Sequence, residues 1–203
     1  MSIKKTILIF AVLLCSIGLK AQDDELLEQI RLVNSGFTSF ESDLFNKVDK
    51  PSKQFEQEGK LYYIKPGCFA AVFTSGRYMI ANDNRLSMNI GKFHGKFRLR
   101  KSGMLRSLSN IFLYGFQGRC KDLAEENDYS VKVHETGPYY QITCTNNNRV
   151  IFGFGFKQVI FKYFKDSLKL KEIILVEDED AKSVYTISNV KYDVKVDSKR
   201  FEF

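Results

Sequence analysis

The sequence predicts a single α+β domain in which a large antiparallel sheet carries amphipathic helices on one face. The chain has 203 residues, of which 44% are hydrophobic and three are prolines. This composition excludes a disordered or collagen-like chain and leaves room for one well-buried core. Helical periodicity occurs in two main segments, whereas most of the remaining chain alternates between apolar and polar residues. No repeat, low-complexity tract or linker interrupts this pattern, which favours one domain over residues 22–203.

The N-terminus has the pattern of a secretory signal peptide over residues 1–21. An apolar run of thirteen residues, Ile7 to Leu19, follows two lysines and ends shortly before Ala21, after which we expect cleavage. A bilayer-spanning helix needs about 20 apolar residues, so this run is too short to be one. A lipoprotein signal ending at Cys15 is the alternative, but that processing requires a small residue where Leu14 stands. We therefore expect a protein that is secreted into the periplasm.

Charge and cysteine content exclude several functional classes. The formal net charge is +7, and residues 1–21 hold three lysines and no acid, so the remainder carries +4. This excess is too small to indicate nucleic-acid binding. Three cysteines remain after cleavage, Cys68, Cys120 and Cys144, which permits one disulfide and leaves at least one free thiol. They form no C-x-x-C pair, so the sequence predicts neither a zinc site nor a redox motif.

The first half of the chain predicts one helix followed by strands. Residues 23–34 place Leu26, Leu27, Ile30 and Val33 on one helical face, and Gly36 follows the helix. From there the apolar period changes to two, with turn residues over 48–52 and at 66–67 and 82–84. The expected strands cover residues 38–47, 55–64, 68–73, 78–81 and 85–90.

Residues 92–100 alternate strictly, so that Lys92, His94, Lys96, Arg98 and Arg100 share one face of an expected strand. A solvated face is the ordinary explanation, because any half-exposed strand shows charged alternation. Docking to an anionic lipid or an acidic partner is the functional alternative.

A second amphipathic helix is expected over residues 102–115, because a stripe of apolar residues returns at a period of 3.6. This stripe consists of Met104, Leu105, Leu108, Ile111 and Phe112. A short third helix is expected over residues 119–126. Only strands follow, and we expect them over residues 129–135, 139–145, 150–156, 158–164, 169–178 and 182–191.

Motifs that carry catalysis are missing from the sequence. It has no G-x-S-x-G elbow, H-E-x-x-H helix, P-loop or G-x-G-x-x-G. His94 and His134 both fall on polar faces of expected strands, which favours surface histidines over general bases. The acidic run from Glu177 to Asp180 lacks the spaced ligands and glycine of a calcium loop, so a solvated turn is the better interpretation.

The segment 150–156 has an unusual distribution of side chains. Phe152, Phe154 and Phe156 share one face of the expected strand, and Gly153 and Gly155 share the other. Glycine inside a strand marks a bend or the close approach of a ligand or another backbone. One interpretation is a curved sheet with a helix packed on the phenylalanines. The other is a concave face that leaves a cavity for a hydrophobic ligand.

Several segments, in this order along the chain, resemble the LolA-like family of periplasmic outer-membrane lipoprotein carriers. The first joins a glycine, a short apolar strand, a basic residue before proline, and a phenylalanine. The segments are Gly59-Lys60-Leu61-Tyr62-Tyr63-Ile64-Lys65-Pro66-Gly67-Cys68-Phe69, then residues 80–88, 173–178, 184–190 and 201–203. The helix at 102–115 also falls where the family has one.

This resemblance implies an incomplete, strongly curved antiparallel β-barrel whose apolar concave face is covered by helices that act as a lid. Members of the family receive a lipoprotein from an inner-membrane ABC-type complex and pass it to an outer-membrane acceptor. Lys65 stands where the family usually has an arginine that hydrogen-bonds to the lid, and Phe69 where it has an aromatic residue near the groove mouth. Two features depart from the pattern: Lys65 lacks the planar fork of arginine, and Ala70-Ala71 replace bulkier residues and open room.

The leading functional hypothesis is a periplasmic carrier that binds acyl chains of a lipoprotein or another lipid, is a monomer, and needs no cofactor or metal. The residues expected to bind lipid are Tyr63, Phe69, Phe73, Leu105, Leu108, Phe112, Phe152, Phe154 and Phe161, with Lys65 as the gating residue. The second hypothesis is an interaction module with a filled core that docks through Lys96, Arg98 and Arg100. An enzyme comes third, because no set of acid, base and nucleophile is recognisable.

Overall fold

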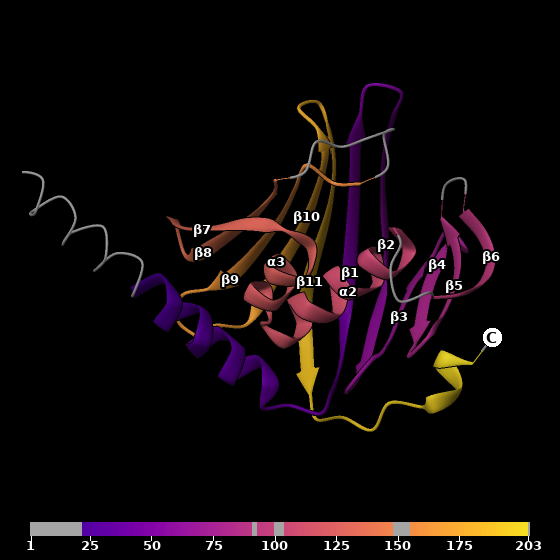
Figure 1. Ribbon diagram of the computed structural model, residues 1–203. Helices are drawn as coiled ribbons and strands as arrows, with labels where there is room; N and C mark the ends of the chain where they lie inside the picture. The colour runs from indigo at the N-terminus through magenta and orange to yellow at the C-terminus, as the bar shows by residue number, and fades with distance from the viewer. Residues whose placement is uncertain (1–21, 91–92, 100–103, 148–154, 203) are drawn as a thin grey trace, which may run out of the picture.

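A computed structural model describes residues 22–90, 93–99, 104–147 and 155–202. The described residues form an 11-stranded sheet in the order β6-β5-β4-β3-β2-β1-β11-β10-β9-β8-β7, in which every neighbouring pair is antiparallel (Figure 1). The strands are β1 Ser39–Lys50, β2 Lys53–Ile64, β3 Cys68–Phe73, β4 Tyr78–Asn82, β5 Arg85–Ile90, β6 Phe93–Arg98, β7 Tyr129–Thr136, β8 Tyr139–Asn146, β9 Gln158–Phe164, β10 Leu170–Asp178 and β11 Ala181–Tyr192.

The sheet is open, because its edge strands β6 and β7 do not pair with each other. The strands follow one another as antiparallel hairpins on either side of one long-range pairing, in which β1 lies against β11. Phe40 is opposite Tyr192 in this pairing, and a register shift lies between Glu41 and Asp43. An incomplete antiparallel barrel of α+β class is therefore confirmed.

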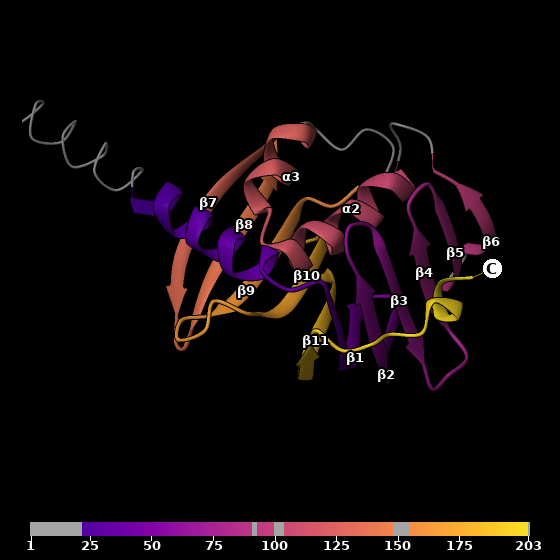
Figure 2. The same ribbon diagram turned by 90° about the horizontal axis from the view of Figure 1, so that it is seen from below.

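Three helices cover the concave face of the sheet (Figure 2). They are the N-terminal helix at residues 22–35, α2 at Met104–Gln117 and α3 at Cys120–Asn127. Helices α2 and α3 connect β6 with β7, which are the two edges of the sheet. The connection must therefore cross the sheet, and it does so on the apolar concave side. None of the helices in the described part of the chain combines the length and hydropathy needed to cross a bilayer.

Strand boundaries differ from expectation mainly at the first hairpin. The expected turn over 48–52 is shorter in the structure, since β1 continues to Lys50 and β2 begins at Lys53. Val48 is buried and lies opposite Phe55 on one side and Ser183 on the other. Pairing on both sides holds this segment in the sheet although its sequence favours a turn.

The expected strand over 150–156 lies mostly outside the described residues, which resume at Gly155. Gly155 and Phe156 belong to no strand, so the expectation is wrong for this end of the segment. Gly155 has a φ of 143°, a backbone conformation that other residues rarely adopt and that breaks the strand period. Phe156 is partly buried against the core.

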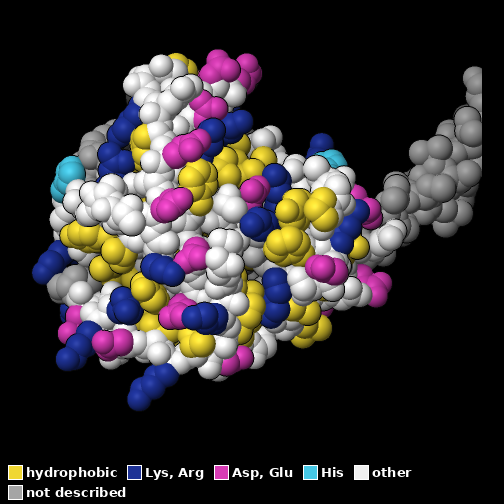
Figure 3. Space-filling model, turned by 180° about the vertical axis from the view of Figure 1, so that it is seen from behind, with side chains coloured by type: hydrophobic (Ala, Val, Ile, Leu, Met, Phe, Trp, Pro, Cys, Tyr) yellow, Lys and Arg dark blue, Asp and Glu magenta, His cyan; other side chains and the backbone are white. Residues whose placement is uncertain are grey.

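The outer face of the sheet is polar and mixed in charge, with apolar side chains scattered between the charges (Figure 3). Oppositely charged side chains pair across neighbouring strands, as Asp43 does with Lys60 and Glu172 with Lys162. The C-terminal 3₁₀ helix η1, Ser198–Phe201, returns to β3 and β4 and buries Phe201. The three cysteines in the described residues, at positions 68, 120 and 144, are free thiols.

Candidate functional site

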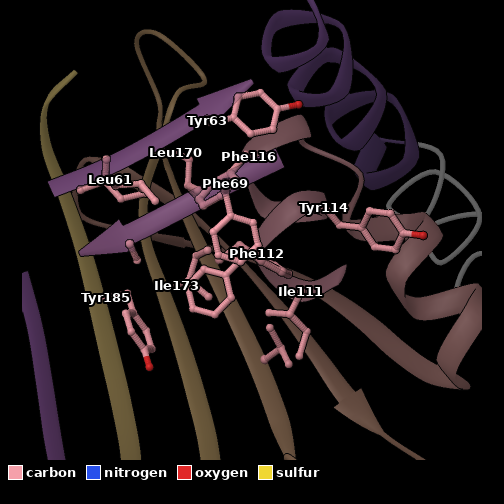
Figure 4. Close-up of a cluster of buried hydrophobic side chains, with 14 of the residues drawn as sticks. Leu61, Tyr63, Phe69, Ile111, Phe112, Tyr114, Phe116, Leu170, Ile173 and Tyr185 are labelled. Atoms are coloured by element: carbon pink, nitrogen blue, oxygen red, sulfur yellow. The ribbon is translucent and has the colours of Figure 1, made fainter. Parts of the chain in front are cut away.

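Helix α2 lies on the concave face and buries its apolar stripe against the sheet (Figure 4). Ile111, Phe112 and Phe116 are buried, and Leu105 and Leu108 are partly buried against the same cluster. Alternate residues of the strands form the other side, because every second side chain of a strand points to the same face. These strand residues include Phe40, Leu61, Tyr63, Phe69, Phe73, Phe161, Ile173 and Tyr185. An apolar interior between α2 and the sheet is the candidate site.

Aromatic rings make up the centre of this interior. Phe69 and Phe112 stack with their ring centroids 5.5 Å apart, so the first strands and the helix meet directly. Phe116 contacts the rings of Phe40 and Tyr63 at 5.3 and 5.6 Å. Edge-to-face and offset ring pairs of this kind contribute about 1 kcal/mol each beyond the area that they bury.

The C-terminal end of α2 lies close to the sheet at Gly115. A Cβ at this position would lie 2.8 Å from Cε1 of Phe161, so only glycine fits without displacement. The hydroxyl of Tyr163 donates a 2.8 Å hydrogen bond to the carbonyl oxygen of Gly115. The amide of Gln117 donates to the hydroxyl of Tyr63 at 3.0 Å and to the carbonyl oxygen of Pro66 at 2.7 Å. Buried polar contacts therefore hold this end of the helix.

The N-terminal half of α2 is held differently. Leu105 and Leu108 give it a partly buried apolar contact, and its polar contact is made at the surface by Arg106. The Arg106 guanidinium donates to the carbonyl oxygen of Asp83 at 3.3 Å and to Oδ1 of Asn84 at 3.2 Å, both in the β4–β5 turn. Because exposed contacts contribute less than buried ones, this half of the helix is the easier one to lift.

Two lysines approach the C-terminal end of the N-terminal helix. Lys65, in the β2–β3 turn, donates a 2.7 Å hydrogen bond to the carbonyl oxygen of Ser35. Lys169 lies 3.5 Å from the carbonyl oxygen of Val33, and its ammonium group also lies over the rings of Phe37 and Tyr192. Burial lowers the pKa of Lys169 from its ordinary value. Cations at a helix C-terminus interact favourably with the helix dipole, so both lysines hold this helix on the sheet.

Near the C-terminal end of α2, side chains fill the part of the interior that the described residues enclose. The space enclosed by Phe37, Phe40, Phe116 and their neighbours amounts to about 10 Å³. Such a volume holds one water molecule at most. An acyl chain could therefore enter this part of the interior only if α2 or the N-terminal helix moved away from the sheet.

The apolar part of the concave face ends toward the β1–β2 hairpin. Asn46 and Gln57 lie opposite each other there, are buried, and face the same side as Leu44. Gln57 donates a 3.0 Å hydrogen bond to Oδ1 of Asn46, whose own amide donates to the carbonyl oxygen of Val184 at 3.1 Å. This satisfied polar pair interrupts the apolar face of β1, and the buried Val48 lies beyond it.

The titratable groups of the interior remain neutral at physiological pH. Burial raises the pKa of Cys144 and of Tyr185 to about 12. Burial also raises the pKa values of Cys120 and Tyr163 well above their ordinary values. The interior thus offers protonated hydroxyls and thiols instead of an activated nucleophile. In the described ranges of the chain, no group of His, Cys, Asp or Glu side chains is arranged to hold a metal ion.

The structure brings most of the expected lipid-binding residues into this interior. Tyr63, Phe69, Phe73, Phe112 and Phe161 are buried there, and Leu105 and Leu108 lie at its border. Phe152, Phe154 and Arg100 lie outside the described residues. Lys96 and Arg98 are exposed on β6, away from the interior, as are His94 on the same strand and His134 on β7.

Sequence reasoning missed other residues that line the interior. Phe116 follows Phe112 by one helical turn, but the expected helix ended at Gly115, where α2 continues to Gln117. Extending the period of 3.6 past this glycine would have found it. Phe40 and Tyr185 lie on strands whose alternation was recognised, but these two strands come together only through the pairing of β1 with β11.

Comparison with known proteins gives matches in structure alone. No protein-family model matches the chain, and no curated protein matches its sequence. MucB is similar with a TM-score of 0.52 and 8% identity over 90% of this chain, which spans 63% of the length of MucB. An uncharacterized conserved protein from Thermus thermophilus has a TM-score of 0.50 and 8% identity, over 90% of this chain and 94% of its own.

A LolA superfamily protein from Nitrosomonas europaea is also among the matches, with a TM-score of 0.43 and 11% identity over 89% of this chain and 97% of its own. At identities this low, the matches show similarity of fold alone. MucB and the Thermus protein are the two of these matches with TM-scores of 0.50 or more. The chain shares with these two proteins the fold described above, an open, curved antiparallel sheet with helices on its concave face.

Proposed function

We propose that this chain is a non-enzymatic periplasmic carrier that shields acyl chains of a lipoprotein or another lipid between α2 and the concave face of the sheet. Residues 1–21 would direct its export and then be removed. An inner-membrane ABC-type complex would load it, and an outer-membrane acceptor would receive the cargo. Nucleic acid and cofactors have no part in this function.

One observation carries the proposal: an apolar helix face covers an apolar sheet face, while the buried polar contacts of that helix gather at one end. Gln117 and Gly115 make those contacts at the C-terminal end of α2. Lifting the other end would expose Phe69, Phe73 and Leu61, a surface suited to an acyl chain.

The apolar burial that α2 supplies on the sheet and the burial that an acyl chain would supply in its place are of similar size. Burial of an apolar side chain contributes about 2 kcal/mol and burial of a CH₂ group about 0.8 kcal/mol. Withdrawing five apolar side chains of α2 would cost on the order of 10 kcal/mol, and a C16 chain laid in their place would regain about 12 kcal/mol. An acyl chain can therefore replace α2 on the sheet without becoming bound irreversibly.

Lys65 supports a role for the N-terminal helix in gating. Its hydrogen bond to the carbonyl oxygen of Ser35 joins the β2–β3 turn to the end of this helix. The contact is exposed and single, so it can open without a large cost. We propose that release of this contact accompanies entry of the lipid.

The decisive measurement is the lipid content of the protein purified from its native host, read by native mass spectrometry. Bound lipid or lipoprotein is the expected result, together with binding of a fluorescent fatty acid after lipid extraction. Leu105→Gln and Leu108→Gln should weaken that binding, whereas Leu32→Gln, at a leucine that is 56% exposed on the N-terminal helix, should not. Protein that is always empty and binds no fatty acid would disprove the carrier function.

The small space between Phe37, Phe40 and Phe116 favours a second candidate function. With about 10 Å³ of enclosed space, the same fold could act as an interaction module that docks through the basic face of β6. Reversing the charges of Lys96, Arg98 and Arg100 would then abolish docking. The same change would leave fatty-acid uptake intact in a carrier.

A further inference from the structure

A polar cleft of about 670 Å³ lies at the β4–β5 turn, apart from the apolar interior. Its walls come from two places, the turn itself and the neighbouring strand β6. The lining residues are Asn82, Asp83, Asn84, Arg85, Lys96, Phe97 and Arg98. Three of these side chains are cationic and exposed, and the single acid, Asp83, has its Oδ1 beside Gly67 of the β2–β3 turn.

The cations of this cleft are arranged unlike most other charges of the sheet. Arg85 lies directly opposite Arg98 in the antiparallel pairing of β5 with β6. Elsewhere opposite charges face each other, as with Lys47 and Glu56 or Glu41 and Lys191. Like charges directly opposite each other destabilise a sheet, so this arrangement has a cost when nothing binds.

One other like-charge pair of the sheet is compensated. Lys50 faces Lys53 at the first hairpin, but Lys50 forms an ion pair with Glu177. Arg85, Lys96 and Arg98 form no ion pair with any residue that the structure describes. The charge of the cleft is therefore available to a ligand.

We propose that Arg85, Lys96 and Arg98 form a binding site for a phosphate group. Residues directly opposite in an antiparallel pair have Cα atoms about 4.5–5.5 Å apart, so two guanidinium groups can converge on one anion. Each guanidinium presents a planar fork of donors that matches phosphate oxygens, and Lys96 adds a point charge. The cleft wall also holds Asn82, whose amide donates to the carbonyl oxygen of Phe201, and Asn84, whose Oδ1 accepts from Arg106.

The site is separate from the proposed acyl-binding interior and does not depend on it. Its polar lining and three cations disfavour an acyl chain, whereas a phosphate relieves the repulsion between Arg85 and Arg98. A soluble phosphate ester and the headgroup of a phospholipid share this chemistry. The experiment must therefore distinguish these two sources.

Binding would be measured in two arms at about 0.15 M salt, where weak surface attraction is screened. Isothermal titration calorimetry with sn-glycerol 3-phosphate, and with glycerol as the neutral control, tests the soluble ester. Cosedimentation with phosphatidylglycerol vesicles, and with phosphatidylcholine vesicles as the control, tests the headgroup. The Arg85→Gln/Arg98→Gln double variant should bind at least about tenfold more weakly in the arm that responds.

The matched control is Lys132→Gln/Lys182→Gln, which removes two positive charges from exposed positions on β7 and β11. If the protein binds the soluble ester and only the arginine variant loses this binding, the cleft is a phosphate-ester site. Vesicle binding alone, lost in the same variant, identifies a lipid headgroup. Absence of binding in both arms, or an equal loss in the lysine control, would overturn the proposal.

Discussion

The ammonium group of Lys65 donates a 2.7 Å hydrogen bond to the carbonyl oxygen of Ser35, the last residue of the N-terminal helix. The two residues join the β2–β3 turn to a helix that also rests on the sheet through Lys169 and through apolar side chains such as Leu27 and Ile30. This contact combines a charge-assisted hydrogen bond with the favourable placement of a cation at a helix C-terminus.

Lys65→Met should loosen the N-terminal helix. The substitution removes both contributions and should lower the free energy of unfolding by about 0.5–1 kcal/mol. Hydrogen–deuterium exchange should accelerate over residues 22–35 more than in the sheet. Lys65→Arg retains the charge and the donors and should exchange as the wild type does. Unchanged exchange in Lys65→Met would mean that the contact does not hold the helix.

Gly118→Ala should be among the more destabilising single changes to the helical layer. Gly118 has a φ of 68°, and a Cβ there would lie 2.6 Å from the carbonyl oxygen of Ile30 in the N-terminal helix. Gly137→Ala is the matched control, because Gly137 has a φ of 57° and open space around it. Both variants have the cost of positive φ, but Gly118→Ala should lose about 2 kcal/mol more in urea unfolding. Equal losses would show that the N-terminal helix moves easily away from the α2–α3 connection at Gly118.

The three thiols should differ in reactivity. Burial raises the pKa of Cys144 to about 12 and that of Cys120 well above the ordinary value, so neither forms thiolate at pH 8. Cys68 is half-buried and its pKa is also raised, so it should react more slowly than a free cysteine and faster as the pH increases.

Peptide mapping after iodoacetamide treatment tests this order. In the native protein Cys68 should be labelled while Cys120 and Cys144 remain unmodified, and all three should be labelled in urea. Rapid native labelling of Cys144 would show that the layer of helices opens often.

Arg98→Gln should stabilise the protein at low ionic strength. It removes the repulsion with Arg85 across β5 and β6, worth about 0.5 kcal/mol for like charges directly opposite in a sheet. The gain should diminish in high salt, where the Debye length falls to about 3 Å. Lys60→Gln, which breaks the ion pair with Asp43, should change the melting temperature in the opposite direction. A loss of stability in Arg98→Gln at low salt would contradict a like-charge pair at this position.

Local sequence signals predicted many of the elements because their limits are set by neighbouring residues. The expected bounds of β3, β5 and β9 agree with the structure, since residues with turn chemistry, such as Pro66 and Gly67, stand next to alternating segments. The helix α2 continues two residues past its expected end at Gly115, because its apolar contacts continue through Phe116. That glycine is tolerated at the contact with Phe161 instead of ending the helix.

The polar contacts of the candidate site were harder to foresee. Gln117 has no feature in the sequence that marks it, and its partners Tyr63 and Pro66 are more than 50 residues away along the chain. Lys65 was named through the family resemblance, and its contact with Ser35 depends on how the N-terminal helix returns to the sheet. The opposition of Arg85 and Arg98 follows from the register of one hairpin.

The sequence by itself determined which segments form strands and which form helices, because periods of two and 3.6 are local properties of the chain. It also indicated an apolar face rich in phenylalanine and a basic face on β6. Only the tertiary structure decided that β1 pairs with β11, that α2 crosses the concave face, and that little space is left between Phe37, Phe40 and Phe116. These features depend on contacts between residues far apart in the chain, whose energies no local pattern records.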